Sequence, residues 1–116
     1  MSKLLGVHPD LAKVVAEAQT QIPFRVTEGL RTLARQKELL AAGKTKTLNS
    51  RHLTGHAVDV VALVDGNVSW DFPHYQKIAD AMKAVAATHN IPIVWGGDWP
   101  TFKDGVHFEL DRKSYP

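Results

Sequence analysis

The sequence contains no cysteine among its 116 residues. A disulfide framework is therefore excluded, and any metal site has to be built from His, Asp and Glu side chains. Structural zinc sites usually complete their coordination with cysteine, whereas three nitrogen and oxygen ligands plus a water molecule are the pattern of a catalytic site. The absence of thiols thus directs any metal hypothesis toward catalysis.

Long apolar runs are also missing. No stretch reaches the roughly 18 apolar residues that a membrane span needs, so we expect no stable membrane insertion. Residues 1–15 lack the apolar run and small-residue cleavage site of a secretory signal, which predicts synthesis in the cytoplasm. The net charge of +2 and the pI near 9.0 favour an anionic partner such as a cell-wall polymer, nucleic acid or lipid headgroups. Because Lys and Arg form no runs with interleaved aromatics, we do not expect nucleic-acid binding.

The length and an ordinary composition, 44% hydrophobic and 22% charged, predict one domain over residues 1–116. Hydrophobic periodicity predicts seven elements within it. These are helices at residues 9–21, 31–42 and 72–90, and extended segments at residues 24–29, 57–64, 91–95 and 106–110. Their order predicts an α+β fold in which helices pack on a small, largely antiparallel sheet.

Asp59 is the one charged residue in the apolar, β-branched segment 57–64. A buried carboxylate costs several kcal/mol unless it is paired or bound to a metal, so Asp59 needs a partner. His52 stands seven residues earlier, and His107 lies in a later strand three residues after another acid, Asp104. Two imidazoles and one carboxylate, with water in the fourth position, can form a tetrahedral catalytic zinc site.

Each of these residues also has an ordinary structural explanation when taken alone. Asp59 could cap a loop or pair with Arg31 or Arg51, and the histidines could be ordinary polar side chains. His56 follows His52 by four residues, a spacing that aligns two ligands only on a helix. The glycine between them and the β-branched run that follows argue against a helix, so we expect His56 not to be a ligand.

Two segments together resemble the signatures of the zinc peptidase family of D-alanyl-D-alanine carboxypeptidases and bacteriophage L-alanyl-D-glutamate endopeptidases. They are SRHLTGHAVD (residues 50–59) and DGVHFEL (residues 104–110). The resemblance extends to VHPDL (residues 7–11), EGLRTLARQKELLAAGKT (residues 28–45) and WGGDW (residues 95–99), in the same order along the chain. It implies the fold shared by hedgehog proteins and D-Ala-D-Ala peptidases.

Carried over by position, the resemblance makes His52, Asp59 and His107 the ligands of Zn²⁺ and Asp104 the general base. Carboxypeptidase members generally have Glu at the base position, whereas Asp is more similar to the phage endopeptidases. The implied mechanism is metal-assisted hydrolysis, in which zinc lowers the pKa of its bound water toward about 7 and Asp104 accepts the proton.

The resemblance assigns roles to two further polar residues. Arg31 matches an arginine that faces the active site in relatives, where it could stabilise the oxyanion or hold a substrate carboxylate; the alternative is a surface ion pair. Ser50 could bind substrate or brace the turn through hydrogen bonds to the backbone. We expect Trp95 and Trp99 to be core residues. Glu109 is expected on the face of its strand opposite to His107, with a structural or supporting role.

The resemblance implies a phage-type endolysin that cleaves the L-alanyl-D-glutamate bond of peptidoglycan stem peptides. We expect a monomer that is made in the host cytoplasm and reaches the cell wall after another protein permeabilises the membrane. One alternative is a D-alanyl-D-alanine carboxypeptidase or dipeptidase on the same scaffold. Another is a zinc-containing binding domain without catalysis, against which the acid at position 104 argues.

Overall fold

The computed structural model describes residues 4–44, 50–100 and 103–116. Three α-helices, two short 3₁₀ helices and five strands make up this part of the chain. In chain order they are α1 Pro9–Ala18, β1 Phe24–Glu28, α2 Leu33–Ala41, η1 Arg51–Thr54, β2 Ala57–Val64, β3 Asn67–Ser69, α3 Phe72–Thr88, β4 Ile93–Trp95, η2 Gly96–Asp98 and β5 His107–Leu110. None of the helices in these three ranges is long and apolar enough to span a membrane.

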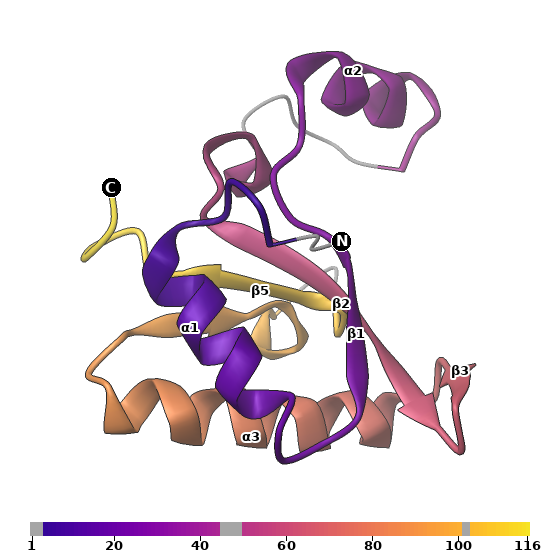
Figure 1. Ribbon diagram of the computed structural model, residues 1–116. Coiled ribbons are helices and arrows are strands. Elements are labelled where there is room, and N and C mark those ends of the chain that lie inside the picture. Colours follow the sequence, from indigo (N-terminus) through magenta and orange to yellow (C-terminus); the bar gives the residue numbers. More distant parts are fainter. Residues whose placement is uncertain (1–3, 45–49, 101–102) are drawn as a thin grey trace.

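The five strands form one antiparallel sheet in the order β1-β2-β5-β4, and β3 pairs with β2 (Figure 1). The register places Asp59 of β2 directly opposite His107 of β5. Glu28 at the end of β1 lies opposite Asp59 on the other side, after an irregularity in the pairing that follows Val26. The α+β class with a small antiparallel sheet, predicted from the sequence, is confirmed.

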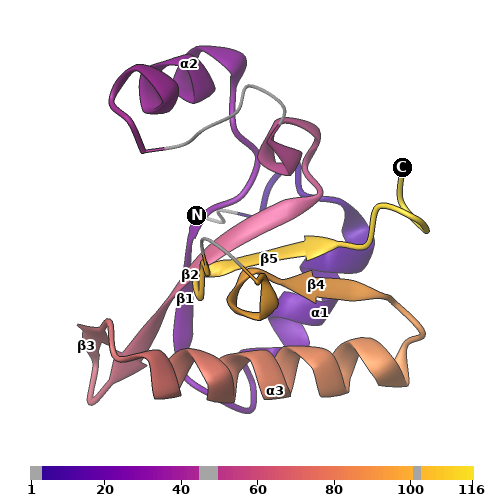
Figure 2. The same ribbon diagram turned by 180° about the vertical axis from the view of Figure 1, so that it is seen from behind.

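One face of the sheet carries the hydrophobic core. α1 and α3 lie side by side across this face, as both views show (Figures 1 and 2). Alternate residues of β2 and β5, among them Val58, Val60, Phe108 and Leu110, are buried in the same hydrophobic cluster as the apolar faces of the two helices. Because side chains alternate along a strand, Asp59 and His107 stand on the opposite face. The core therefore supports the site from behind.

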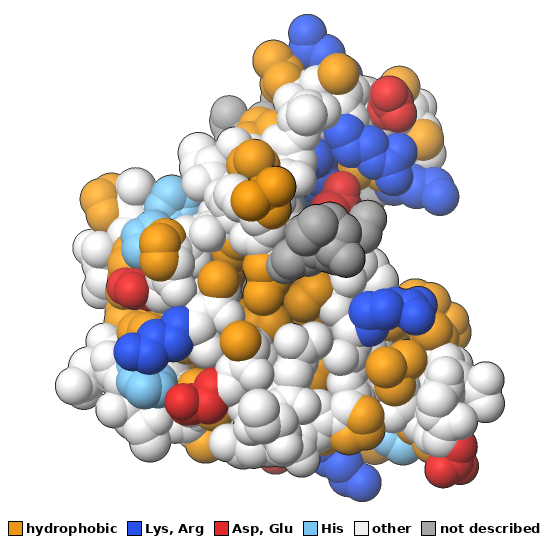
Figure 3. All heavy atoms as spheres, in the orientation of Figure 1, with side chains coloured by type: hydrophobic (Ala, Val, Ile, Leu, Met, Phe, Trp, Pro, Cys, Tyr) orange, Lys and Arg blue, Asp and Glu red, His pale blue; other side chains and the backbone are white. Residues whose placement is uncertain are grey.

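α2 stands away from the sheet and from α1 and α3 (Figure 1), at the upper end of the molecule in the same orientation in Figure 3. Its only buried residue among those described is Gln36, whereas Leu33 and Leu40 are exposed. Thr32 caps the helix by accepting a hydrogen bond from the Arg35 N–H at 3.1 Å. The predicted helix at residues 31–42 is thus present, but its leucines do not join the main core as an amphipathic helix would suggest.

The segment after β2 differs from the prediction. Asp65 and Gly66 form a turn, with positive φ angles of 52° and 80°. The chain then pairs back on β2 as β3, so that Asn67 lies opposite Val64. Two consecutive residues with positive φ are typical of the tight turn of a two-residue hairpin, which explains the additional strand.

Candidate metal and catalytic site

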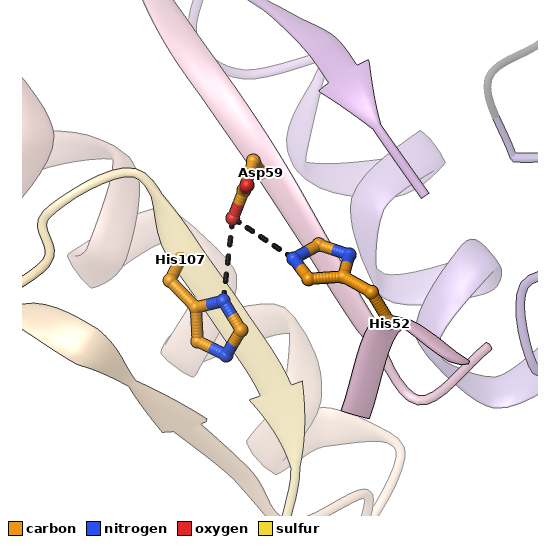
Figure 4. Close-up of side chains that lie close together, drawn as sticks. All are labelled: His52, Asp59 and His107. Carbon is orange, nitrogen blue, oxygen red and sulfur yellow. Dashed lines mark hydrogen bonds and ion pairs between the residues drawn. The ribbon is translucent and has the colours of Figure 1, made fainter. Parts of the chain in front are cut away.

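Three side chains from three different elements converge on one point of the sheet (Figure 4). His52 comes from η1, Asp59 from β2 and His107 from β5. Asp59 Oδ1 lies 3.2 Å from His52 Nε2 and 3.2 Å from His107 Nδ1. One ligand atom from each residue can be chosen so that all three lie within 4.8 Å of one another. This spacing suits three ligands of one metal ion.

The 3₁₀ turn η1 holds His52 in place. The Ser50 hydroxyl caps the turn by accepting a hydrogen bond from the His52 N–H at 3.2 Å. Gly55 ends the turn with a φ of 74°, and a Cβ there would lie 2.3 Å from the Gly6 carbonyl oxygen. The His52 side chain is turned inward, where its Nδ1 donates a hydrogen bond to the Gly29 carbonyl oxygen at 2.8 Å.

That hydrogen bond leaves the other nitrogen of His52 with a lone pair. A carbonyl oxygen can only accept, so the proton of neutral His52 resides on Nδ1. Nε2 is buried and has no hydrogen-bond partner among the described residues, since its contact with Asp59 lacks hydrogen-bond geometry. A buried lone pair aimed at a carboxylate is satisfied by a cation between them, so these residues fit a metal ion.

Charge within the site is strongly coupled. Burial alone would raise the pKa of Asp59, but contacts with His107 and His52 outweigh burial and hold it well below its usual range. Burial alone would lower the pKa of His107, but hydrogen bonds with Asp59 and Glu109 outweigh burial and raise it to about 9. In the metal-free protein, His107 is therefore protonated between two carboxylates, and Asp59 is ionised at neutral pH.

Glu109 shares the face of His107, contrary to the prediction. Its Oε1 lies 2.8 Å from His107 Nε2, and its side chain is only 10% exposed. Residues two positions apart in a strand point to the same side, so the expectation of opposite faces was wrong. Both nitrogens of His107 therefore face carboxylates.

Asp104 lies at the same cavity, on the loop between η2 and β5. Its N–H donates to the Gly96 carbonyl oxygen at 3.0 Å, and its carbonyl oxygen accepts from the His107 N–H at 3.1 Å. Burial and the nearby charge of Asp59 raise the pKa of Asp104. A carboxylate with a raised pKa beside the candidate metal ligands is suited to proton transfer.

Arg31 is buried beside the ligands and is not the surface ion pair considered as an alternative. Its Nε and Nη2 donate to the two oxygens of Glu28 at 2.9 Å and 2.6 Å, and its Nη1 donates to Gln36 at 2.7 Å. Nη2 also lies 3.6 Å from Asp59 Oδ2. The hydrogen bond from Arg31 is the main reason why the pKa of Glu28 is lowered. Arg31 thus connects β1 and α2 to the central carboxylate.

The candidate ligands and Asp104 line an open cavity of about 360 Å³. Ser50 lines it as well as capping η1, and α2 contributes Leu39 to one wall. Trp95 is a core residue as predicted, but Trp99 is not: it is half-buried and lines the cavity, with its ring centroid 5.2 Å from that of His107. The other residues of the lining are Glu28, Arg31, Lys44, Arg51, Glu109 and Arg112.

His56 lies outside this cavity. Its Nδ1 is 2.6 Å from the Thr54 hydroxyl, and its ring packs 5.6 Å from the ring of His8. His8 in turn caps α1 by accepting a hydrogen bond from the Asp10 N–H. The structure thus places His56 near the start of α1, away from the three converging side chains.

Comparison with known proteins adds independent information. A family model described as phage L-alanyl-D-glutamate peptidase matches residues 1–115. The L-alanyl-D-glutamate peptidase of Escherichia phage T5 is 29% identical over 119 residues, which cover 97% of this chain and 86% of the relative. The peptidoglycan L-alanyl-D-glutamate endopeptidase CwlK of Bacillus subtilis is 32% identical over 108 residues, which cover 82% of this chain and 65% of CwlK.

Solved structures agree with these relatives. The L-Ala D-Glu endopeptidase ChiX of Serratia marcescens superimposes with a TM-score of 0.94 at 52% identity, covering 98% of this chain and 87% of ChiX. The D,D-dipeptidase VanXYg, at 16% identity and a TM-score of 0.55, covers 90% of this chain and 50% of VanXYg and shares the fold alone. The match over residues 1–115 shows that the chain belongs to the phage L-alanyl-D-glutamate peptidase family.

Proposed function

We propose that this chain is a zinc-dependent endopeptidase that cleaves the L-alanyl-D-glutamate bond of peptidoglycan stem peptides. The observation that carries the proposal is the convergence of His52, Asp59 and His107 on one point, with Asp104 at the same cavity. Membership of the peptidase family and the names of the T5, CwlK and ChiX relatives support the choice of bond.

His52, Asp59 and His107 would hold the metal ion through two imidazole nitrogens and one carboxylate oxygen. This donor set, without thiolates, is one that catalytic zinc sites use, and it leaves a fourth position for water or substrate. When bound, zinc would lower the pKa of a water molecule toward about 7 and polarise the carbonyl group of the substrate.

The chain's own residues supply the proton transfers and the positioning. Asp104 accepts the proton of the attacking water and passes it to the departing amine, a role favoured by its raised pKa. Arg31 lines the cavity with its guanidinium fixed by Glu28, so that its remaining N–H donors can stabilise negative charge on the substrate. Ser50 positions His52 and adds a hydroxyl to the substrate cavity.

We further propose that the protein acts as a monomer on the cell wall and that, in a phage, this activity serves host lysis. The family description and the T5 relative support this context. Turbidity loss of cells whose membrane has been permeabilised, on addition of the protein, would test it. Unchanged turbidity alongside cleavage of isolated peptidoglycan would refute the lytic role and keep the chemistry.

The decisive experiment is mass spectrometry of purified peptidoglycan digested by the zinc-loaded protein, with a chelator-treated sample as control. We expect new carboxyl ends at L-alanine and new amino ends at D-glutamate, both absent after chelation. Release of free D-alanine would instead select the carboxypeptidase, and intact peptidoglycan in both samples would favour a binding domain.

A further inference from the structure

Glu109 is a buried acid beside the candidate metal site for which the proposed mechanism has no role. It is 7% exposed, and its Oε1 lies 2.8 Å from His107 Nε2. Its other oxygen lies 3.6 Å from Nε of Arg112, whose side chain is 64% exposed. Such an exposed ion pair contributes little, so the contact with His107 is the main interaction that accounts for a buried carboxylate here.

The backbone around Glu109 is held on both sides. In β5, Glu109 lies opposite Ala57 of β2 and Val94 of β4. As the cross-strand partner of Glu109, Ala57 has its small side chain on the same face of the sheet. Because β5 is an inner strand of the sheet, the carboxylate is presented to His107 from a fixed position.

The two candidate ligand histidines use opposite nitrogens. His52 gives Nδ1 to the carbonyl oxygen of Gly29 and turns Nε2 toward Asp59. His107 gives Nε2 to Glu109 and turns Nδ1 toward Asp59. In each ring, one nitrogen is engaged by an acceptor outside the three candidate ligands, and the other nitrogen faces Asp59 at the point where the three residues converge.

We propose that Glu109 is a positioning residue that selects the tautomer of His107 and so makes Nδ1 the metal-binding atom. The inference rests on the proposed function, because it requires a metal ion held by His52, Asp59 and His107. Both ring nitrogens of His107 face carboxylates when no metal is bound. With a metal ion held by Asp59 in place of the contact to Nδ1, the Glu109 carboxylate, which can only accept a hydrogen bond, would keep the remaining imidazole proton on Nε2 and leave the lone pair of Nδ1 for the metal. The negative charge of Glu109 also makes His107 a more basic ligand, and with that of Asp59 it balances a divalent cation.

The test compares Glu109→Gln and Glu109→Ala with the unmodified protein. The amide oxygen of glutamine can accept the same hydrogen bond without the charge, whereas alanine leaves Nε2 without its acceptor. Glu38→Ala serves as the matched control, because it removes an exposed glutamate from α2, outside the cavity lining. The measurements are the zinc dissociation constant, from competition with a chromophoric chelator, and the ¹⁵N shifts of the His107 ring in the zinc-loaded protein.

We expect Glu109→Ala to weaken zinc binding by about 10- to 100-fold and Glu109→Gln by a smaller factor, with Glu38→Ala unchanged. The nitrogen shifts of the unmodified protein should show a proton on Nε2 of His107 and metal on Nδ1. The inference would be overturned if Glu109→Gln and folded Glu109→Ala both bound zinc as tightly as the unmodified protein. It would also be overturned if the nitrogen shifts of the unmodified protein placed the metal on Nε2 of His107. These outcomes are separable from failure of the proposed function, in which the unmodified protein would bind no zinc or cleave no stem peptide.

Discussion

Replacing Asp104 with asparagine should separate catalysis from folding and metal binding. Asparagine has nearly the same shape and retains the two backbone hydrogen bonds of this residue, to Gly96 and from His107. It removes the negative charge of the side chain and its ability to accept a proton. We therefore expect Asp104→Asn to keep its full zinc content and to lose activity.

The expected loss follows from the size of general base catalysis, which contributes about 10² to 10⁴ in rate. At 1.36 kcal/mol for each factor of ten, this is about 3 to 5 kcal/mol of transition-state stabilisation. The free energy of unfolding, in contrast, should rise or stay the same. Burial and the charge of Asp59 raise the pKa of Asp104, so its ionised form is disfavoured in the folded metal-free protein at neutral pH, and a neutral amide removes that penalty.

The assay is kcat/KM on a soluble stem-peptide fragment, with zinc content and the denaturation midpoint of the chelated protein measured on the same preparations. Asp98→Asn is the matched control, because Asp98 is an exposed acid of η2 whose carboxylate pairs with Lys83 at 2.6 Å. Activity of Asp104→Asn within about threefold of this control would refute the assignment of Asp104 as the general base.

Three further predictions follow from the same geometry. His52→Ala should lower zinc content as well as activity, whereas His56→Ala should keep normal zinc stoichiometry. The reverse result would show that His56, and not His52, is the ligand. Gly96→Ala should cost about 1–3 kcal/mol of stability and most of the activity, because its Cβ would lie 2.3 Å from a backbone oxygen of the loop that carries the general base. Gly105→Ala is the control and should be tolerated, because its Cβ would lie 3.4 Å from the nearest atom, in the Phe72 side chain. Equal losses of stability for Gly96→Ala and Gly105→Ala in urea unfolding would contradict this reasoning. Despite the burial of His107, two carboxylates raise its pKa to about 9. The metal-free protein should therefore have extra stability below about pH 6.5 and lose it as the pH rises through 9. Urea midpoints of the chelated protein that do not change over this range would disprove the raised pKa of His107.

The parts of the fold closest to the site were the most predictable. β2 runs over Ala57–Val64 as predicted, because a β-branched apolar run lies between Gly55 and the turn at Asp65. Within that run, Asp59 stood out as the residue that core packing could not explain. The pairing of β2 with β5, which places Asp59 opposite His107, is a long-range contact and could not be read from periodicity.

Other features were missed for identifiable reasons. β3 is three residues long and exposed for most of its length, so it has too few buried positions to produce a periodic signal. The Asp65-Gly66 pair that precedes it is a recognised hairpin sequence and could have revealed it. The position of Trp99 in the cavity wall depends on how the loop after β4 folds over the sheet, which local sequence does not determine.

The prediction that placed Glu109 on the face opposite to His107 overlooked how polar and apolar residues alternate in β5. The spacing HFEL already puts Glu109 on the face of His107, since side chains two apart in a strand share a side. Two polar residues at this spacing, separated by the fully buried Phe108, divide β5 into a core face and a site face. β2 is divided in the same way by Asp59 between Val58 and Val60. A single polar residue in an apolar strand indicates that it has a polar or metal partner. When two paired strands both alternate between core residues and polar residues, the polar residues of one strand lie beside those of the other. Asp59 and His107 are therefore brought together by the strand pairing itself and are held by the same backbone that carries the core, whereas His52 is added from η1.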